Sequence, residues 1–440
     1  MISYVEIKDL YGMYDYTMHF TDENIVSIIT GPNGFGKTTI LRVVHNLCDC
    51  NFWYFYNLRF SLINIRFQEA NGHESSFILE HVPILSDDEI SDSDSAPATV
   101  LRIRYKKMTP SEKDIEEFQI TKQDYEIKVK EINRRLRRSY YYDTQLDDDS
   151  LLSLYHDLRE DTFLQKNARN IILFFENKHC CFIKEQRIIS FNKEQTYERV
   201  PSFVNRYSID EISENIRLLY NKSQMEYAQK SHSIDGTFIS RLLSQDVERI
   251  LEQQEYAVRI VRLKEKTDQL NRFSLLKDKV EFVEEYSDKY KDVLSLHLED
   301  MEKKLSSFDA FLEKLELFSA LIYRNVLSNK DMILDYRGIT IMMKNGAIVP
   351  LSKLSSGEQN LIILYYRLVF ESNSRTILLI DEPENSLHMA WLNNMLSDYI
   401  KIAEATHCQI LIATHSPAFI NGRWELTFDL FENNQRTTIQ

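Results

Sequence analysis

Strand-like apolar segments open the chain. ISYVEI, YTMHF and NIVSIIT begin at Ile2, Tyr16 and Asn24, and their apolar positions fit β-strands. The third segment runs into a glycine-rich loop, GPNGFGKTT, and the following TTILRVVHNL has the apolar spacing of a helix. The pattern therefore predicts a strand, a glycine loop and a helix in succession.

The next segments predict a second, smaller sheet. RFSLINIRFQ, SSFILEHV and TVLRIRYKK are strand-like and suggest an antiparallel sheet beside the first strands. Residues 85–97 are acidic, serine-rich and poor in apolar residues, which is typical of a solvated loop. From about Lys107 to Arg169 the chain is charged and is predicted to be helical. A strand-like block, IILFFENKHCCFIKEQRIISF, then interrupts the helices.

A second helical region is predicted from about Ser208 to Leu327. Within it, one stripe recurs at spacings of three and four, which indicates a short helical hairpin or packing stripe; its members are Leu298, Met301, Leu305, Phe308, Leu312 and Leu315. The Asn345-Gly346 pair in GITIMMKNGAIVPL predicts a hairpin turn. TILLIDE and CQILIATHS are short apolar runs with helix between them, so we expect parallel strands of a buried sheet.

These elements predict an α/β fold with a mixed sheet, a small antiparallel β subdomain and helical or short coiled-coil insertions. We expect three parts. They are an N-terminal lobe at 1–106, a helical insertion region at 107–330 with a strand block at about 171–190, and a C-terminal lobe at 331–440.

Composition narrows the class of protein. The 440 residues are 43% hydrophobic and 12% aromatic, as in a folded globular chain. The formal net charge of -14 argues against nucleic acid binding over the whole surface. No run of about 18 apolar residues occurs and the N-terminus lacks the pattern of a signal peptide, so we expect no membrane partner and a cytoplasmic protein. The five cysteines form no CxxC pair, which disfavours disulfides and structural zinc.

The glycine loop carries the clearest chemical signal. Gly31 to Thr38 matches G-x-x-x-x-G-K-[ST], the P-loop pattern, in full. Backbone N–H groups of such a loop converge on phosphate oxygens, while Lys37 neutralises the β and γ oxygens and the Thr38 hydroxyl holds Mg²⁺. We therefore predict bound ATP and Mg²⁺, with nucleotide contacts from Gly31, Pro32, Asn33, Gly34, Phe35, Gly36, Lys37, Thr38 and Thr39.

Two acids follow an apolar run near the C-terminus. Ile377-Leu-Leu-Ile380 leads into Asp381 and Glu382, as expected where a buried strand ends beside a bound nucleotide. We predict that Asp381 reaches Mg²⁺ through water and that Glu382 is the general base for the attacking water. His415 ends the next apolar strand, where its side chain is placed to contact a γ-phosphate. Lys37, Glu382 and His415 are thus the predicted catalytic residues.

The order of these motifs resembles that of ABC-type ATPases. The P-loop is followed by the Ser-Ser-Gly-Glu-Gln segment of KLSSGEQN, the strand ending in Asp-Glu, ENSLH and the histidine strand. The resemblance implies a P-loop ABC-type ATPase head, in which two subunits sandwich two ATP molecules. It also implies that Ser355 and Gly357 act in trans on the γ-phosphate, and we expect Ser356 and Glu358 to belong to the same nucleotide-binding segment. Ser356 and Glu358 depart from the usual L-S-G-G-Q, which makes a transporter subunit a poorer reading.

The segment DEPENSLH is similar to the RecF, SMC and OLD side of this superfamily. The resemblance implies a D-loop formed by Asn385, Ser386, Leu387 and His388. For the Q-loop residue, which would contact both nucleotide and Mg²⁺, Gln186 is favoured because it follows an apolar strand after the first insertion. Gln68 in IRFQEA is the alternative.

Three segments resemble the ATPase subunits of bacterial anti-phage systems such as PARIS and Septu; they are LSSGEQN, LLIDEPENSLH and LIATHSPAFINGRWELTFDL. The resemblance implies a homo-oligomer that senses a phage-encoded trigger and holds or releases a separate effector, expected to be a TOPRIM or HNH nuclease. OLD-family nucleases continue past the histidine strand into a TOPRIM domain, whereas this chain stops about 25 residues after His415.

A basic and aromatic run, RRLRRSYYY at 134–142, leaves DNA as a further expected partner. The same run also fits a solvated helix face paired with DDDS at 147–150. The alternative function is therefore a DNA-repair ATPase similar to RecF and SMC proteins that grips DNA with its helical region.

Overall fold

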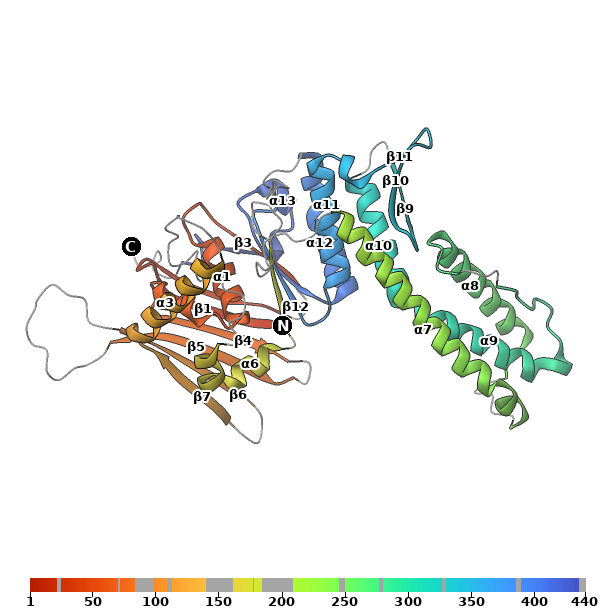
Figure 1. Ribbon diagram of the computed structural model, residues 1–440, viewed down its shortest axis with the longest axis horizontal. Helices are drawn as coiled ribbons and strands as arrows, with labels where there is room; N and C mark the ends of the chain where they lie inside the picture. The colour runs from red at the N-terminus through yellow and green to blue at the C-terminus, as the bar shows by residue number, and fades with distance from the viewer. Residues whose placement is uncertain are drawn as a thin grey trace, which may run out of the picture. The chain divides into compact units, whose positions relative to one another are not determined.

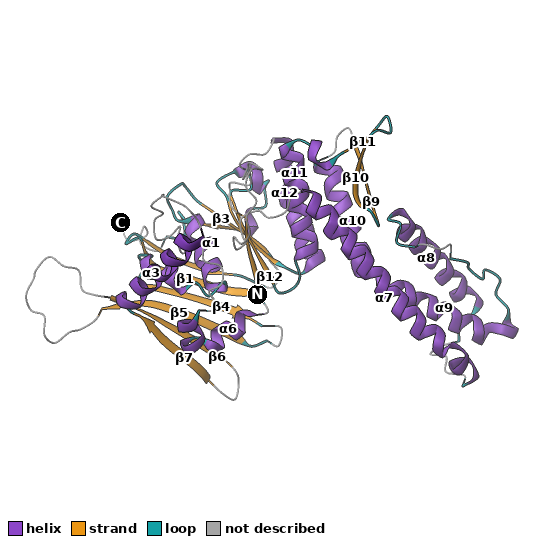
Figure 2. Cartoon of the chain, in the orientation of Figure 1, coloured by secondary structure: helices purple, strands orange, loops and turns teal. Residues whose placement is uncertain are grey.

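The computed structural model describes residues 1–21, 25–69, 72–83, 99–108, 113–139, 161–176, 178–183, 209–244, 250–276, 280–326, 330–384 and 389–434. The chain folds as two compact units (Figures 1 and 2). Unit 1 comprises Met1–Arg206 and Ser372–Gln440, and unit 2 comprises Tyr207–Glu371. Within the described part of the chain, no helix combines the length and the apolar composition needed to cross a membrane.

A parallel sheet of five strands forms the centre of unit 1. Its order is β14 (Thr427–Asp429), β3 (Val26–Thr30), β13 (Gln409–Ala413), β12 (Thr376–Asp381) and β8 (His179–Ile183). Every residue of β3, β12 and β13 is buried, because helices cover such a sheet and leave no solvated face for polar residues. Helix α1 (Lys37–Cys48) packs against β8, β12 and β13. The predicted buried parallel strands are confirmed.

An antiparallel sheet of six strands completes unit 1. Its order is β2 (Tyr14–His19), β1 (Ile2–Leu10), β4 (Leu62–Gln68), β5 (Glu74–Pro83), β6 (Thr99–Met108) and β7 (Lys113–Ile120). The Gln409 side chain joins the two sheets, because its Oε1 accepts from the Ile2 N–H at 2.7 Å and its Nε2 donates to the Ile2 C=O at 2.9 Å. The predicted antiparallel sheet is confirmed, and so is the mixed α/β class.

Two local predictions in this unit are wrong. Strand β7 lies in the region expected to be helical, because its charged residues mask the alternation that buries Phe118 and Ile120 opposite β6. Residues 169–176 form helix α6 (Arg169–Glu176), and within the described part of the strand-like block, which ends at Ile183, the strand is His179–Ile183. A short apolar run fits the residue periods of both a helix and a strand. Here the contact between Phe175 and Phe77 favours the helix.

The other described elements of unit 1 are short helices and turns and two longer helices, α3 and α12. They are α2 (Phe52–Asn57), α3 (Lys122–Ser139), α5 (Thr162–Asn167), α12 (Met389–Thr406), α13 (Pro417–Ile420) and a 3-10 turn at Trp424–Leu426.

Unit 2 is mainly helical. It contains α7 (Ile209–Leu243), α8 (Gln253–Arg272), α9 (Lys291–Leu305), α10 (Asp309–Asn325) and α11 (Ser356–Tyr366), which continues as a π-helical turn at Arg367–Glu371. Its small sheet has the order β11 (Ile348–Val349), β10 (Gly338–Met343) and β9 (Lys330–Asp335). Short 3-10 turns lie at Asp288–Tyr290, Ser306–Phe308 and Leu351–Lys353. The predicted stripe along α9 and α10 is buried throughout, and the hairpin around Asn345-Gly346 is present, so both predictions are confirmed.

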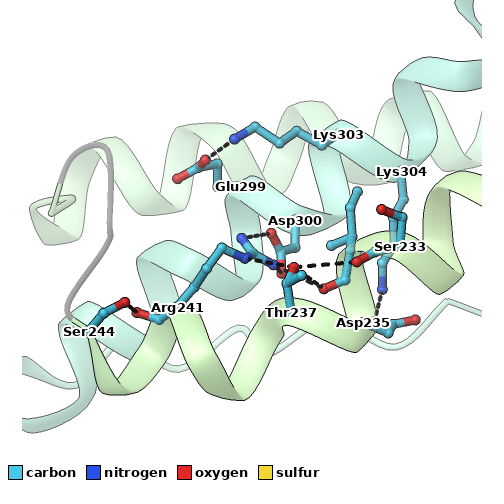
Figure 3. A network of polar contacts seen from close by, with 10 residues as sticks. Ser233, Asp235, Thr237, Arg241, Ser244, Glu299, Asp300, Lys303 and Lys304 are labelled. Atoms are coloured by element: carbon cyan, nitrogen blue, oxygen red, sulfur yellow. Dashed lines mark hydrogen bonds and ion pairs between the residues drawn. The ribbon is translucent and has the colours of Figure 1, made fainter.

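An ion pair between Arg241 and Asp300 connects α7 with α9 (Figure 3). Arg241 donates from both terminal nitrogens to the two carboxylate oxygens of Asp300, each at 2.7 Å. Asp300 is only 3% exposed, so its negative charge is stabilised by the two hydrogen bonds from Arg241 and not by water. Lys304 and Asp235 form a second ion pair between the same helices, but Asp235 is largely exposed.

Replacement of Asp300 by alanine is expected to destabilise unit 2 by about 2–3 kcal/mol, because it leaves a partly buried arginine without its partner. Hydrogen exchange of the α7 and α9 amides measures this loss. The matched control is Asp235→Ala, which removes an exposed pair and should cost less than about 1 kcal/mol. Equal protection in the two variants would contradict the prediction.

Candidate active site

The P-loop connects β3 to α1 in unit 1. Gly36, the residue before the helix, has φ 84°, and a Cβ there would lie 3.1 Å from the Leu10 side chain. Glycine is therefore required by both conformation and space. The Tyr16 hydroxyl donates to the Phe35 carbonyl at 2.9 Å, and the Phe35 ring packs between Tyr14 and Phe431. These contacts hold the loop in shape.

Lys37 is buried at the start of α1. Its Nζ donates to the carbonyl oxygens of Gly31 at 2.8 Å and Pro32 at 3.2 Å, and it lies 3.9 Å from Glu382 Oε1. The ammonium group is thus surrounded by oxygen atoms of the loop and of the acid that follows β12. Phosphate oxygens would offer the same chemistry with more negative charge.

Thr38 and Asp381 meet beside Lys37. The Thr38 hydroxyl donates to Asp381 Oδ1 at 3.0 Å, which joins the start of α1 to the end of β12. Hydroxyl and carboxylate oxygens are the hard ligands that Mg²⁺ prefers, and Mg²⁺ commonly takes only one or two protein ligands and keeps several waters. The two residues therefore fit the predicted magnesium site.

Glu382 is held in an uncommon backbone conformation. Its φ is 46°, in the left-handed region, and its N–H donates to the Ala413 carbonyl at 2.8 Å. One carboxylate oxygen faces Lys37 and the other lies 2.6 Å from His415 Nδ1. Strain of this kind concentrates at functional sites, where the surrounding structure enforces it.

Burial raises the pKa of Glu382 to about 7, and the neighbouring Glu384 carboxyl group adds to the increase. The hydrogen bond and charge of His415 oppose this shift. Glu382 is therefore more basic than an ordinary glutamate, as a general base at neutral pH requires.

These side chains surround one cavity of ≈ 530 Å³. It is lined by Tyr11, Asn33, Gly34, Gly36, Lys37, Thr38, Thr39, Glu382 and His415. All but Tyr11 were singled out in the sequence. Tyr11 follows β1, and its hydroxyl lies 2.8 Å from Thr39 Oγ1. Its aromatic ring carried no signal in the sequence, because only the pairing of β1 with β2 and β4 brings it beside the P-loop.

Glu384 is a second residue that the sequence did not assign. Its carboxylate is 7% exposed, accepts from the Thr414 hydroxyl and lies 3.6 Å from His415 Nδ1. In the sequence, its position two residues after Glu382 is the feature that could have identified it as a site residue. Glu382, Glu384 and His415 together offer three ligand atoms within 4.8 Å of one another, so a metal ion could also be held here.

The predicted signature segment lies in unit 2, at the start of α11. Ser355 is the N-cap: its hydroxyl accepts from the Glu358 N–H at 3.3 Å, and the Glu358 carboxylate accepts from the Ser355 N–H at 2.9 Å. This reciprocal pair is a capping box. Gly357 lies in the first turn, where a Cβ would meet no atom within 4 Å. Ser356 is the first helical residue and is exposed.

The structure describes only some of the other predicted site residues. Gln186 and the predicted D-loop, Asn385 to His388, lie outside the described residues, as does the end of the basic run at 140–142. Gln68 ends β4, where its backbone exchanges hydrogen bonds with Met1. It does not line the cavity.

A P-loop at the edge of a buried parallel sheet, with acids at the end of the neighbouring strand, defines a nucleotide-hydrolysing protein. The chain matches the family described as "AAA ATPase domain" over residues 1–420, so it belongs to this family and is an ATPase.

Known proteins show partial similarity. Protein ea59 of Escherichia phage lambda is 31% identical over 120 residues, which is 27% of this chain and 23% of that protein. The chain thus spans about a quarter of this curated relative. Two solved SMC head structures align over most of the chain at 11% identity. One, the SMC head bound to the C-winged helix domain of ScpA, covers 96% of this chain and 91% of its own, with a TM-score of 0.33. The other, from Thermotoga maritima, covers 97% and 92%, with a TM-score of 0.32.

Proposed function

We propose that this ATPase is an ABC-type head and the ATP-hydrolysing subunit of a bacterial anti-phage defence complex. The observation that carries the nucleotide chemistry is the cavity that gathers Lys37, Glu382 and His415 beside the Thr38–Asp381 pair. The motif order supports the ABC-type assignment. The defence role is supported by the resemblance of LSSGEQN and LLIDEPENSLH to PARIS and Septu ATPases.

In the proposed mechanism, the P-loop N–H groups bind the β and γ phosphates of ATP, and Lys37 exchanges its loop carbonyl partners for phosphate oxygens. Thr38 and Asp381 hold Mg²⁺, which supplies charge neutralisation at the phosphates. Glu382 accepts a proton from the attacking water, whose oxygen bonds to the γ-phosphorus as the bond to the leaving ADP oxygen breaks. His415 contacts the γ-phosphate and orients Glu382.

The proposal assigns the signature segment to a second copy of the chain. Ser355 and Gly357 of one subunit contact the γ-phosphate held by the other, with Ser356 and Glu358 in the same segment, so that ATP closes a head-to-head dimer. The helices of unit 2 hold a separate nuclease effector, and a phage product releases it by shifting the ATP-bound population.

Affinity purification of the tagged chain, co-expressed with the products of its neighbouring genes, tests the defence role. With ATP and Mg²⁺ present, we expect a complex whose mass corresponds to several copies of this chain plus a nuclease; Lys37→Ala should dissociate the copies. A chain that recovers no protein partner, but binds DNA in an ATP-dependent and salt-sensitive manner, would favour the DNA-repair alternative.

A further inference from the structure

Lys330, the first residue of β9, contacts the signature segment of its own unit. Its Nζ lies 2.5 Å from Glu358 Oε1, and the two side chains are partly buried, at 21% and 16% exposed. The other carboxylate oxygen of Glu358 accepts from the Ser355 N–H at 2.9 Å and from the Ser355 hydroxyl at 2.8 Å. Glu358 is thus shared between the lysine and the serine.

This arrangement occupies the donors that the proposed γ-phosphate contact needs. Both the N–H and the hydroxyl of Ser355 point to the carboxylate of Glu358. A phosphate at the start of α11 would therefore compete with an anion that is already there. Two negative groups in contact repel strongly at partly buried positions, so phosphate binding requires that the carboxylate be withdrawn or neutralised.

Glu358 competes with a phosphate for the Ser355 donors because its carboxylate is ionised. Burial acts to raise its pKa, but the contacts with Lys330 and with the Ser355 donors outweigh burial, and the pKa is lowered overall. Glu358 therefore remains ionised at neutral pH. A glutamine at this position would carry no charge, so the need for a neutralising partner follows from the glutamate at 358.

We propose that Lys330 is a positioning residue for the trans γ-phosphate contact, which rests on the proposed ATP sandwich. Lys330 neutralises the Glu358 carboxylate. It also keeps this carboxylate in place when a phosphate accepts the hydrogen bonds of the Ser355 N–H and hydroxyl instead. Lys330 begins a strand that pairs with β10, and α10 packs against that strand. A movement of these elements that withdrew Lys330 would expose the phosphate to the Glu358 charge and would weaken ATP-dependent closure.

The test compares Lys330→Met in the natural chain and in a Glu358→Gln chain. In the natural chain, we expect about a tenfold loss of ATP turnover and of ATP-dependent self-association, because one unneutralised charge faces the phosphate. Binding of a fluorescent ATP analogue to the isolated subunit should not change, since Lys37 and the P-loop are intact. In the Glu358→Gln chain, the same lysine change should alter turnover less than about twofold, because no charge remains to be neutralised.

The other possible outcomes would overturn either the role of Lys330 or the proposed ATP sandwich itself. Equal losses in both backgrounds would mean that Lys330 only supports the fold and would overturn the inference. Unchanged turnover in Lys330→Met, with ATP-dependent association intact in the natural chain, would overturn the inference alone. No ATP-dependent association in the natural chain would overturn the proposed sandwich as well. Lys344→Met, in the exposed hairpin turn, is the matched control for loss of a lysine.

Discussion

ATP turnover is expected to fall at least about 100-fold when Glu382 becomes glutamine, and by a similar factor when Lys37 becomes alanine. Glu382→Gln removes the only proton acceptor that faces both Lys37 and His415 among the described residues. Lys37→Ala removes the buried ammonium group that we expect to neutralise the phosphate oxygens. Phosphate release in the presence of Mg²⁺ measures both variants.

The two variants should differ in nucleotide binding. Glu382→Gln keeps the loop and its lysine, so we expect it to retain a fluorescent ATP analogue and to accumulate as the ATP-bound form. Lys37→Ala should bind the analogue more weakly. Matched controls are Glu404→Gln and Lys344→Ala, both at exposed positions outside the cavity. Unchanged turnover in both Lys37→Ala and Glu382→Gln would show that this cavity does not hydrolyse ATP.

Gly357→Glu should strongly reduce ATP turnover without disturbing the fold. No atom lies within 4 Å of a Cβ built at Gly357, so α11 has room for a side chain. If the signature segment contacts the γ-phosphate, the added carboxylate blocks and repels it, and turnover should fall about 100-fold. Analogue binding should persist, because the P-loop and Lys37 are unchanged in this variant.

Mixing Gly357→Glu with Lys37→Ala subunits tests whether the contact is made in trans. In a mixed dimer, one site combines both defects and the other combines an intact P-loop with an intact signature segment. Random pairing should therefore restore about a quarter of the natural turnover, although each variant alone is inactive. If mixed dimers form, as shown by native mass measurement, but turnover stays absent, each site would have to be completed within one chain.

Much of this architecture was predictable because its signals are local. The P-loop is a spacing of glycines, a lysine and a threonine within nine residues, and its flanking strand and helix show their own periods. The apolar runs of β12 and β13 also identify themselves, because a strand covered on both faces has no polar positions. The errors at β7 and α6 arose where charges or a short apolar run left two periods possible, and contacts with distant residues such as Phe77 decided between them.

Sequence alone determined the chemical groups: a P-loop pattern with Lys37, a hydroxyl and a carboxylate at Thr38 and Asp381 that suit Mg²⁺, and a signature-like segment at Ser355 to Glu358. Only the tertiary structure decided how these groups influence one another. Parallel pairing of β12 and β13 places Glu382 beside His415, and burial of Glu382 in this packing changes its basicity. Strand β9 places Lys330 beside Glu358, which lies 28 residues further along the chain. Such contacts depend on chain packing between distant segments, and no local pattern of residues encodes them.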